Sequence, residues 1–144
     1  MTRGAMITGL YIVITYLLAP VSFGPLQFRV AEALTVLPII FPEAIPALFI
    51  GVFLSNIIGG LGLVDIIGGS LVTLLAAYIT YLFKDNILAY LSPVILNGVL
   101  ISIYLHILFG LPYWLTTLQI SASEAVVVFL IGYPLIKYLK KNMQ

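Results

Sequence analysis

Long uninterrupted apolar runs limit what this chain can fold into more than any other feature of its sequence. Of its 144 residues, 62% are hydrophobic and only 8% are charged, whereas an ordinary soluble domain is about 25% charged. So little polar surface remains to face water that lipid is the solvent that suits the chain. We therefore expect an all-α membrane protein whose residues 1–144 form a single integral-membrane domain.

Six segments are predicted to be transmembrane helices in a multi-pass protein of the cell membrane. A helix needs about 20 residues to cross the hydrocarbon core. The second segment is shorter, so we expect its backbone to be buried in protein or to line a cavity. Six spans put both termini on one side, together with most basic residues, and the positive-inside rule makes that side cytoplasmic. The predicted helices cover about 4–20, 29–41, 44–60, 65–83, 87–109 and 116–136.

Small residues spaced four apart predict where helices approach one another closely. In the first helix, Ala5 and Gly9 form such a pair, which fits either packing within the bundle or docking of a separate protein. The third helix has a longer stripe, which predicts close packing along its length. That stripe consists of Ala47, Gly51, Ser55 and Gly59.

Polar residues within the predicted helices identify a candidate binding site. A charged side chain at the bilayer centre costs about 2.5–3.5 kcal/mol on insertion scales, so one that is present needs a partner or a function. In the predicted orientation these residues cluster in the outer half of the membrane, on several helices, which indicates a small-molecule pocket open to the outside. The candidates are Arg29, Glu32, Asn56, Asn97, Tyr104 and Glu124.

Structural roles are open for each of these candidates. Glu32 follows Arg29 by three residues and can pair with it on one helical face, and Arg29 is also a possible partner for Glu124. Asn56 and Asn97 can form hydrogen bonds between helices. Tyr104 can stack on a ring or pack in the core.

Three further polar or aromatic positions are assigned structural roles. Asp65 is placed to cap the N-terminus of the fourth helix. His106 and Trp114 fit the membrane interface.

Several functional classes are disfavoured by what the sequence lacks. It has no cysteine and one histidine, which leaves no plausible metal site, and a net charge of +1 argues against nucleic acid as a partner. Neither a phosphate-binding G-x-x-x-x-G-K-[ST] loop nor a G-x-S-x-G nucleophile elbow is present. We therefore expect no enzyme and no resident cofactor, and ATP-driven transport would require a partner.

Four stretches, taken in order, resemble the queuosine-precursor transporter (QueT) family, whose members are substrate-binding S-components of energy-coupling factor (ECF) transporters. The resemblance covers most of the chain and is weaker in the first helix. The stretches are FGPLQFRVAEALTVLP at 23–38, SNIIGGLGLVDIIGGSLVTLLAAY at 55–78, PVILNG at 93–98 and SASEAVV at 121–127.

The resemblance implies a six-helix S-component bundle that captures a 7-deazaguanine at the outer face. The implied ligand is the aminomethyl precursor, the cyano precursor or queuine, and the implied partners are a transmembrane coupling protein and two cytoplasmic ATPase subunits. The loop at 22–28 would close over the ligand before the subunit topples in the membrane. Family members dock through A-x-x-x-A in the first helix, where this chain has Ala5 and Gly9.

The chemistry of a guanine edge suits the residue types found. Its two adjacent N–H donors can be accepted by one carboxylate, and its carbonyl can accept from an amide such as Asn56 or Asn97. We expect Glu124 to accept the hydrogen bonds of this edge and Glu32 to face a cationic substituent.

Three alternatives remain open. One is an S-component for a different vitamin, and another is a small oligomeric membrane channel, although a continuous row of pore-lining polar residues is missing. The third is an intramembrane enzyme that uses Ser121 or Ser123 near Glu124.

Overall fold

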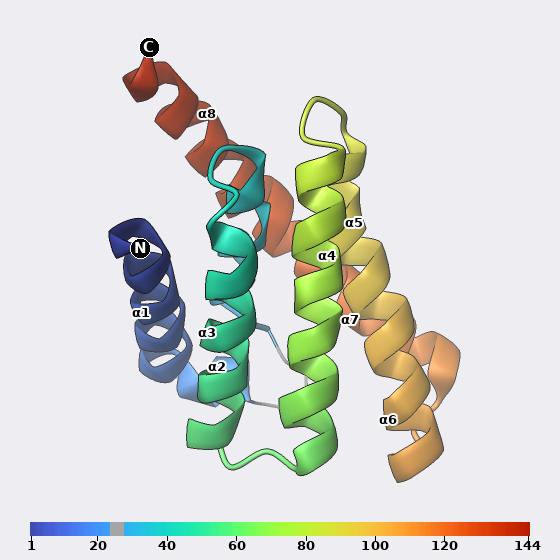
Figure 1. Cartoon of the computed structure of the whole chain (residues 1–144). Coiled ribbons are helices and arrows are strands. Elements are labelled where there is room, and N and C mark those ends of the chain that lie inside the picture. The colour runs from blue at the N-terminus through green and yellow to red at the C-terminus, as the bar shows by residue number, and fades with distance from the viewer. Residues whose placement is uncertain (24–27) are drawn as a thin grey trace.

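The computed structural model describes residues 1–23 and 28–144, and this part of the chain is helical, without a strand. The helices pack side by side in a single bundle (Figure 1). The first half contains α1 (Thr2–Leu17), α2 (Ala19–Ser22), η1 (Val30–Ile39), α3 (Ala44–Ile58), η2 (Asp65–Gly69) and α4 (Ser70–Leu82). The second half contains α5 (Leu88–Leu96), η3 (Asn97–Ile101), α6 (Ser102–Phe109), α7 (Tyr113–Val127), η4 (Val128–Gly132) and α8 (Tyr133–Met143).

Each of the six predicted segments is helical, and three of them are long and apolar enough to cross a membrane. Each is a continuous helix with a π-helical turn, which begins the first of them and lies between two α-helical parts in the other two. They cover Asp65–Leu82, Leu88–Phe109 and Tyr113–Met143, while η1 and α3 are shorter apolar helices. The all-α membrane class is therefore supported, and six complete spans remain a prediction.

The short segment η1 lies inside the bundle. It is a 3₁₀-helix of ten residues, which at about 2.0 Å rise per residue is roughly 20 Å long and too short to span a bilayer alone. All of its residues from Ala31 to Ile39 are buried, and it contacts α1, α4 and η4. This confirms the expectation that a short, irregular backbone segment is covered by protein.

The stripe of small residues on α3 packs against the N-terminal part of the chain. A Cβ atom on Gly51 would lie 3.1 Å from Cβ of Tyr11 in α1, closer than most Cβ contacts in proteins. At Gly59 it would lie 2.6 Å from the Phe23 ring, too close to fit without movement. The close packing predicted for this stripe is confirmed.

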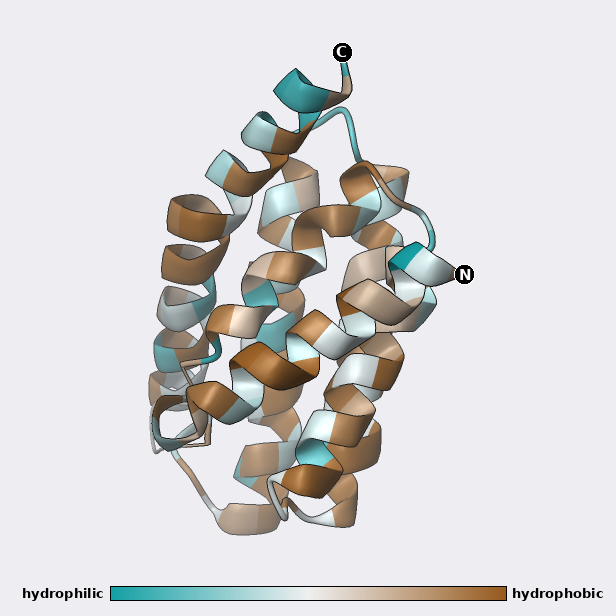
Figure 2. Cartoon of the chain, turned by 90° about the vertical axis from the view of Figure 1, so that its left-hand side faces the viewer, coloured by the Kyte–Doolittle hydropathy of each residue, from teal (hydrophilic) through white to brown (hydrophobic). Residues whose placement is uncertain are grey.

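The two ends of the bundle contain different turns, and both termini lie toward one of them. Both termini lie toward the same end as the turn between α4 and α5, and the turns that follow α3 and α6 lie at the opposite end (Figure 1). Hydrophobic colouring covers most of the helical surface, and the most hydrophilic turns are at the C-terminal end (Figure 2). Large exposed apolar side chains include Leu10, Leu71, Ile103, Leu118 and Leu130, as expected for helices that face lipid.

Candidate functional site

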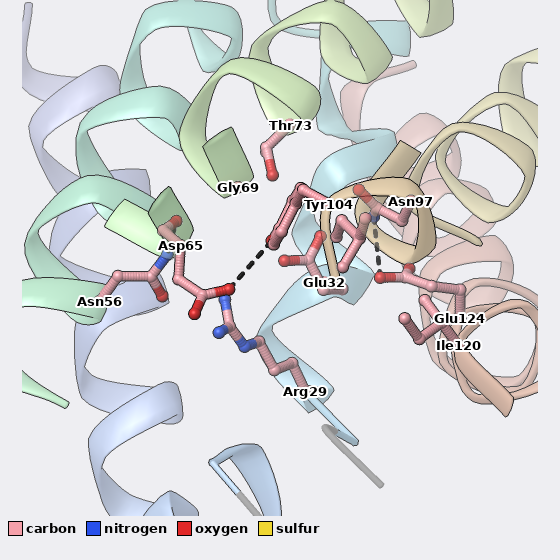
Figure 3. A pocket seen from close by; sticks show the side chains of 11 residues that line it. Arg29, Glu32, Asn56, Asp65, Gly69, Thr73, Asn97, Tyr104, Ile120 and Glu124 are labelled. Atoms are coloured by element: carbon pink, nitrogen blue, oxygen red, sulfur yellow. Dashed lines mark hydrogen bonds between the residues drawn. The ribbon is translucent and has the colours of Figure 1, made fainter. Parts of the chain in front are cut away.

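A small polar pocket lies within the bundle, in the half that contains the turns after α3 and α6. All six residues that the sequence nominated for substrate binding line it, so the helices bring together residues almost 100 positions apart. Only about 30 Å³ of the pocket is wide enough for the centre of a water molecule, although about 410 Å³ in and around it, open solvent included, is free of atoms. The lining residues are Arg29, Glu32, Asn56, Asp65, Gly69, Thr73, Asn97, Ile101, Tyr104, Ile120 and Glu124 (Figure 3).

Each of the three carboxylates in the pocket accepts one hydrogen bond from a neighbouring helix. The Tyr11 hydroxyl of α1 donates to Glu32 Oε1, and Asn97 Nδ2 donates to Glu124 Oε1 at 2.8 Å. The Tyr104 hydroxyl of α6 donates to Asp65 Oδ1 at 3.0 Å. These bonds fix one oxygen of each carboxylate and leave the other oxygen available.

Four buried acceptor atoms that line the pocket have no hydrogen-bond partner within residues 1–23 and 28–144. They are Glu32 Oε2, Asn56 Oδ1, Asn97 Oδ1 and Glu124 Oε2. Their side chains are only 4%, 1%, 1% and 8% exposed, respectively. Because a buried polar atom without a partner costs about 1–3 kcal/mol, such a cluster indicates a site that a ligand completes. One donor, Arg29 Nε, is likewise buried without a partner.

Arg29 does not pair with Glu32 as an i, i+3 salt bridge. It precedes η1 with an extended backbone, φ −96° and ψ 101°, so the two side chains do not share a helical face. The ion pair found in the described part of the chain is Arg3–Glu43, at 3.5 Å on the surface. The Arg29 guanidinium instead lies 5.6 Å from the centre of the Phe23 ring and extends toward the pocket (Figure 3).

With this geometry established, comparison with known protein families decides the classification. The family model described as QueT transporter matches residues 1–141, nearly the whole chain. The chain belongs to the QueT transporter family. It is thus a member of the family of ECF S-components, a substrate-binding membrane component of a transporter. Searches of curated proteins and of solved structures gave no match.

In this QueT family member, Asp65 is a pocket residue that the sequence reasoning missed. It was expected to cap the fourth helix, but no side-chain capping bond forms there, and that prediction is wrong. The Tyr104 hydroxyl instead donates to Asp65 Oδ1 at 3.0 Å.

The two asparagines of the site connect the helices that line it through hydrogen bonds, and each also has an unpartnered side-chain oxygen. Asn56 Nδ2 donates to the backbone oxygen of Asp65 at 2.9 Å, which links α3 to η2, and Asn97 links η3 to α7 through Glu124. The expected hydrogen bonds between helices therefore exist. Since Oδ1 of each asparagine remains unpartnered, these structural bonds and a ligand contact are compatible.

Two of the three π-helical turns begin at residues of the pocket, η2 at Asp65 and η3 at Asn97. A π turn inserts an extra residue into an α-helix and is frequent at functional sites. Nearby, a Cβ atom on Gly69 would lie 3.2 Å from Asn56 Nδ2, so this glycine keeps the space in front of the amide open. Hydrophobic periodicity alone does not reveal such turns.

The remaining nominated residues lie away from the pocket. Ala5 and Gly9 are exposed on α1, and among the described residues no side chain or other helix lies within 4 Å of where a Gly9 Cβ would be, so Gly9 does not pack against the described part of the bundle. His106 is exposed and pairs with the Leu111 backbone oxygen at 2.6 Å, and Trp114 is 77% exposed, as expected at an interface. The loop predicted to close over the ligand includes residues 24–27, which lie outside the described residues.

Proposed function

We propose that this chain captures a queuosine precursor of the 7-deazaguanine class in the pocket around Glu32 and Glu124. Membership of the QueT transporter family supports uptake of a small molecule. We further propose that an ECF coupling protein and two ATPase subunits supply the energy, because the sequence contains no nucleotide-binding loop of its own.

The observation that carries this proposal is the set of four buried acceptor atoms without partners. They call for a ligand rich in hydrogen-bond donors. A 7-deazaguanine offers a ring N–H and an amino group on its guanine edge, plus a pyrrole N–H. We assign the guanine edge to Glu124, whose Oε2 is free while Asn97 holds Oε1. Bidentate acceptance by a carboxylate is the strong form of this interaction.

The carbonyl oxygen of the ligand is assigned to Arg29. The side-chain nitrogens of Asn56 and Asn97, which the sequence suggested for this task, already donate to Asp65 and Glu124. Arg29 Nε is a buried donor without a partner at the same pocket, and a guanidinium has five N–H donors. Tyr104 lines the same wall and provides an aromatic face for the ring.

Binding requires the pocket to widen. Ligand sites typically measure about 300–1,000 Å³, whereas only about 30 Å³ here admits the centre of a water molecule, room for about two waters. The lining side chains therefore have to rotate to admit a ligand. We propose that Tyr104 moves, which breaks its bond to Asp65.

The predicted orientation places this pocket toward the outside of the cell. Arg3 is at the start of α1, Lys84 is in the turn between α4 and α5, and Lys137 is in α8. The termini and that turn lie toward one end of the bundle (Figure 1), and the positive-inside rule assigns that end to the cytoplasm. Asn56 and Asp65 flank the turn at the opposite end. Capture from outside, followed by reorientation of the subunit, is consistent with this arrangement.

The exposed face of α1 is the proposed docking surface for the coupling protein. Ala5 and Gly9 let another helix approach closely, and an apolar groove beside them runs between α1 and α8, lined by Met6, Leu10 and Leu139 among others. We expect Gly9→Leu to reduce co-purification with the coupling protein and ATPases while ligand affinity stays unchanged. Loss of ligand binding in this variant, or full co-purification, would contradict the assignment. Val126→Leu is the control, because Val126 is exposed on α7 and does not line this groove.

Calorimetric titration of the purified detergent-solubilised chain tests the binding proposal. The ligands are aminomethyl-deazaguanine, cyano-deazaguanine, queuine and guanine. We expect tight 1:1 binding of at least one deazaguanine and much weaker binding of guanine. If a folded sample binds none of them, the proposal fails and an S-component for a different vitamin becomes the better hypothesis.

A further inference from the structure

The pocket contains more negative than positive formal charge. Among the described residues that line it, Glu32, Asp65 and Glu124 are acidic and Arg29 is basic, so three negative charges and one positive charge give a formal sum of −2. The ion pair found within residues 1–23 and 28–144 lies elsewhere, on the surface. The carboxylates of the pocket are thus held by neutral donors and not by salt bridges.

Neutral donors compensate a buried carboxylate only in part. Burying a charge without a partner of opposite sign is expensive, and Glu32 and Glu124 each retain one unpartnered oxygen although they are 4% and 8% exposed. A neutral ligand would exclude water from the pocket and leave its excess negative charge uncompensated. A cationic ligand would reduce it.

We propose that the pocket selects a positively charged ligand and that Asp65 is the residue that contacts its ammonium group. This inference deepens the proposed function and depends on it. Among 7-deazaguanines it predicts selection of those with an amine on the substituent at the five-membered ring over the neutral cyano compound.

The position of Asp65 suits an ammonium contact. It begins η2, and Asn56 holds its backbone oxygen at 2.9 Å, so the residue is fixed while its side chain remains partly exposed. Its Oδ1 has a single neutral donor, the Tyr104 hydroxyl at 3.0 Å. An ammonium group can replace that donor when Tyr104 moves to admit a ring.

The opposite end of the pocket is occupied by Glu124 and Asn97. Figure 3 shows Asp65 and Glu124 on either side of Tyr104 and Glu32. In a 7-deazaguanine the guanine edge lies on the six-membered ring and the aminomethyl group on the five-membered ring. With the edge at Glu124, the substituent is therefore directed toward the end that Asp65 occupies.

The test compares two ligands that differ in charge. Calorimetric affinities of aminomethyl-deazaguanine and cyano-deazaguanine are measured for the wild type, Asp65→Asn and the matched control Asp85→Asn, which makes the same change in an exposed turn. We expect the wild type to prefer the amine by roughly 10- to 150-fold, the range for hydrogen bonds to charged groups. In Asp65→Asn the amine should lose most of that advantage while the cyano compound keeps its affinity. Asp85→Asn should change neither.

Each outcome has a distinct meaning. Equal wild-type affinity for the amine, for its neutral N-acetyl derivative and for the cyano compound would overturn the charge inference without any mutant, while the proposed function would stand. A preference that persists in Asp65→Asn but disappears in Glu32→Gln would move the ammonium site to Glu32 and overturn the assignment. Absence of binding by every deazaguanine would instead refute the proposed function.

Discussion

Glu124→Gln separates a ligand-binding role from a structural one, because the two roles predict opposite changes in stability. Glu124 is buried, its Oε1 accepts from Asn97 Nδ2 at 2.8 Å, and its Oε2 has no partner. Glutamine has the same shape and its oxygen can keep the bond to Asn97. The variant therefore removes a buried charge and one unpartnered acceptor and introduces an amide NH₂ group with two donors.

The unliganded protein should be no less stable after this change. An unpartnered buried polar atom costs about 1–3 kcal/mol, more when it is charged, and removing the charge lowers that penalty. We therefore expect the midpoint of thermal unfolding in detergent to stay the same or rise. Ligand affinity should fall, because the new N–H₂ group faces the donors of the guanine edge. The loss of a charge-assisted hydrogen bond of about 1.5–3 kcal/mol corresponds to about 10- to 150-fold.

Calorimetry and thermal unfolding of the same samples provide the assay. Glu43→Gln is the matched control, since Glu43 makes a surface ion pair with Arg3, and such pairs contribute about 0–1 kcal/mol. It should leave ligand affinity unchanged. The reasoning would be refuted if Glu124→Gln lowered the unfolding midpoint and kept wild-type affinity, because the carboxylate would then be a structural element.

Two further substitutions test contacts around the pocket. Tyr11→Phe removes the hydroxyl that donates to Glu32 and leaves the buried carboxylate without that donor. The free energy of unfolding of the unliganded protein should therefore fall by about 1–3 kcal/mol, and the protein should unfold at lower temperature. An unchanged unfolding midpoint would show that the bond contributes nothing. Gly98→Ala places a Cβ atom onto Ser121 Oγ, and overpacking of this kind costs about 1–3 kcal/mol. The double variant with Ser121→Ala should recover stability, and a failure to recover would locate the strain elsewhere.

Polarity in an apolar chain was sufficient to predict most of the site from the sequence. Because buried polar groups in lipid need partners or functions, residues such as Glu32, Asn97 and Glu124 are informative without any structure. All six nominated residues line one pocket. Their binding roles remain proposals, because a pocket of suitable composition is not a measured affinity.

The parts that sequence reasoning missed depend on backbone geometry. The π turns that begin at Asp65 and Asn97 do not change apolar periodicity enough to be predicted. Asp65 was predicted to be an N-cap because aspartate before an apolar run usually caps a helix. In the structure its carboxylate instead accepts a hydrogen bond from Tyr104, which belongs to a helix distant in sequence. The predicted ion pair between Arg29 and Glu32 is wrong for a similar reason, because Arg29 lies outside the helix.

We propose that a 7-deazaguanine binds among Glu32, Asn97 and Glu124. The most direct test is an experimental structure of the chain with aminomethyl-deazaguanine bound. We predict a ring within this pocket, with its guanine edge at Glu124 and its amine at Asp65. A ligand located in the groove between α1 and α8, or a pocket that stays closed at saturating ligand, would contradict the account.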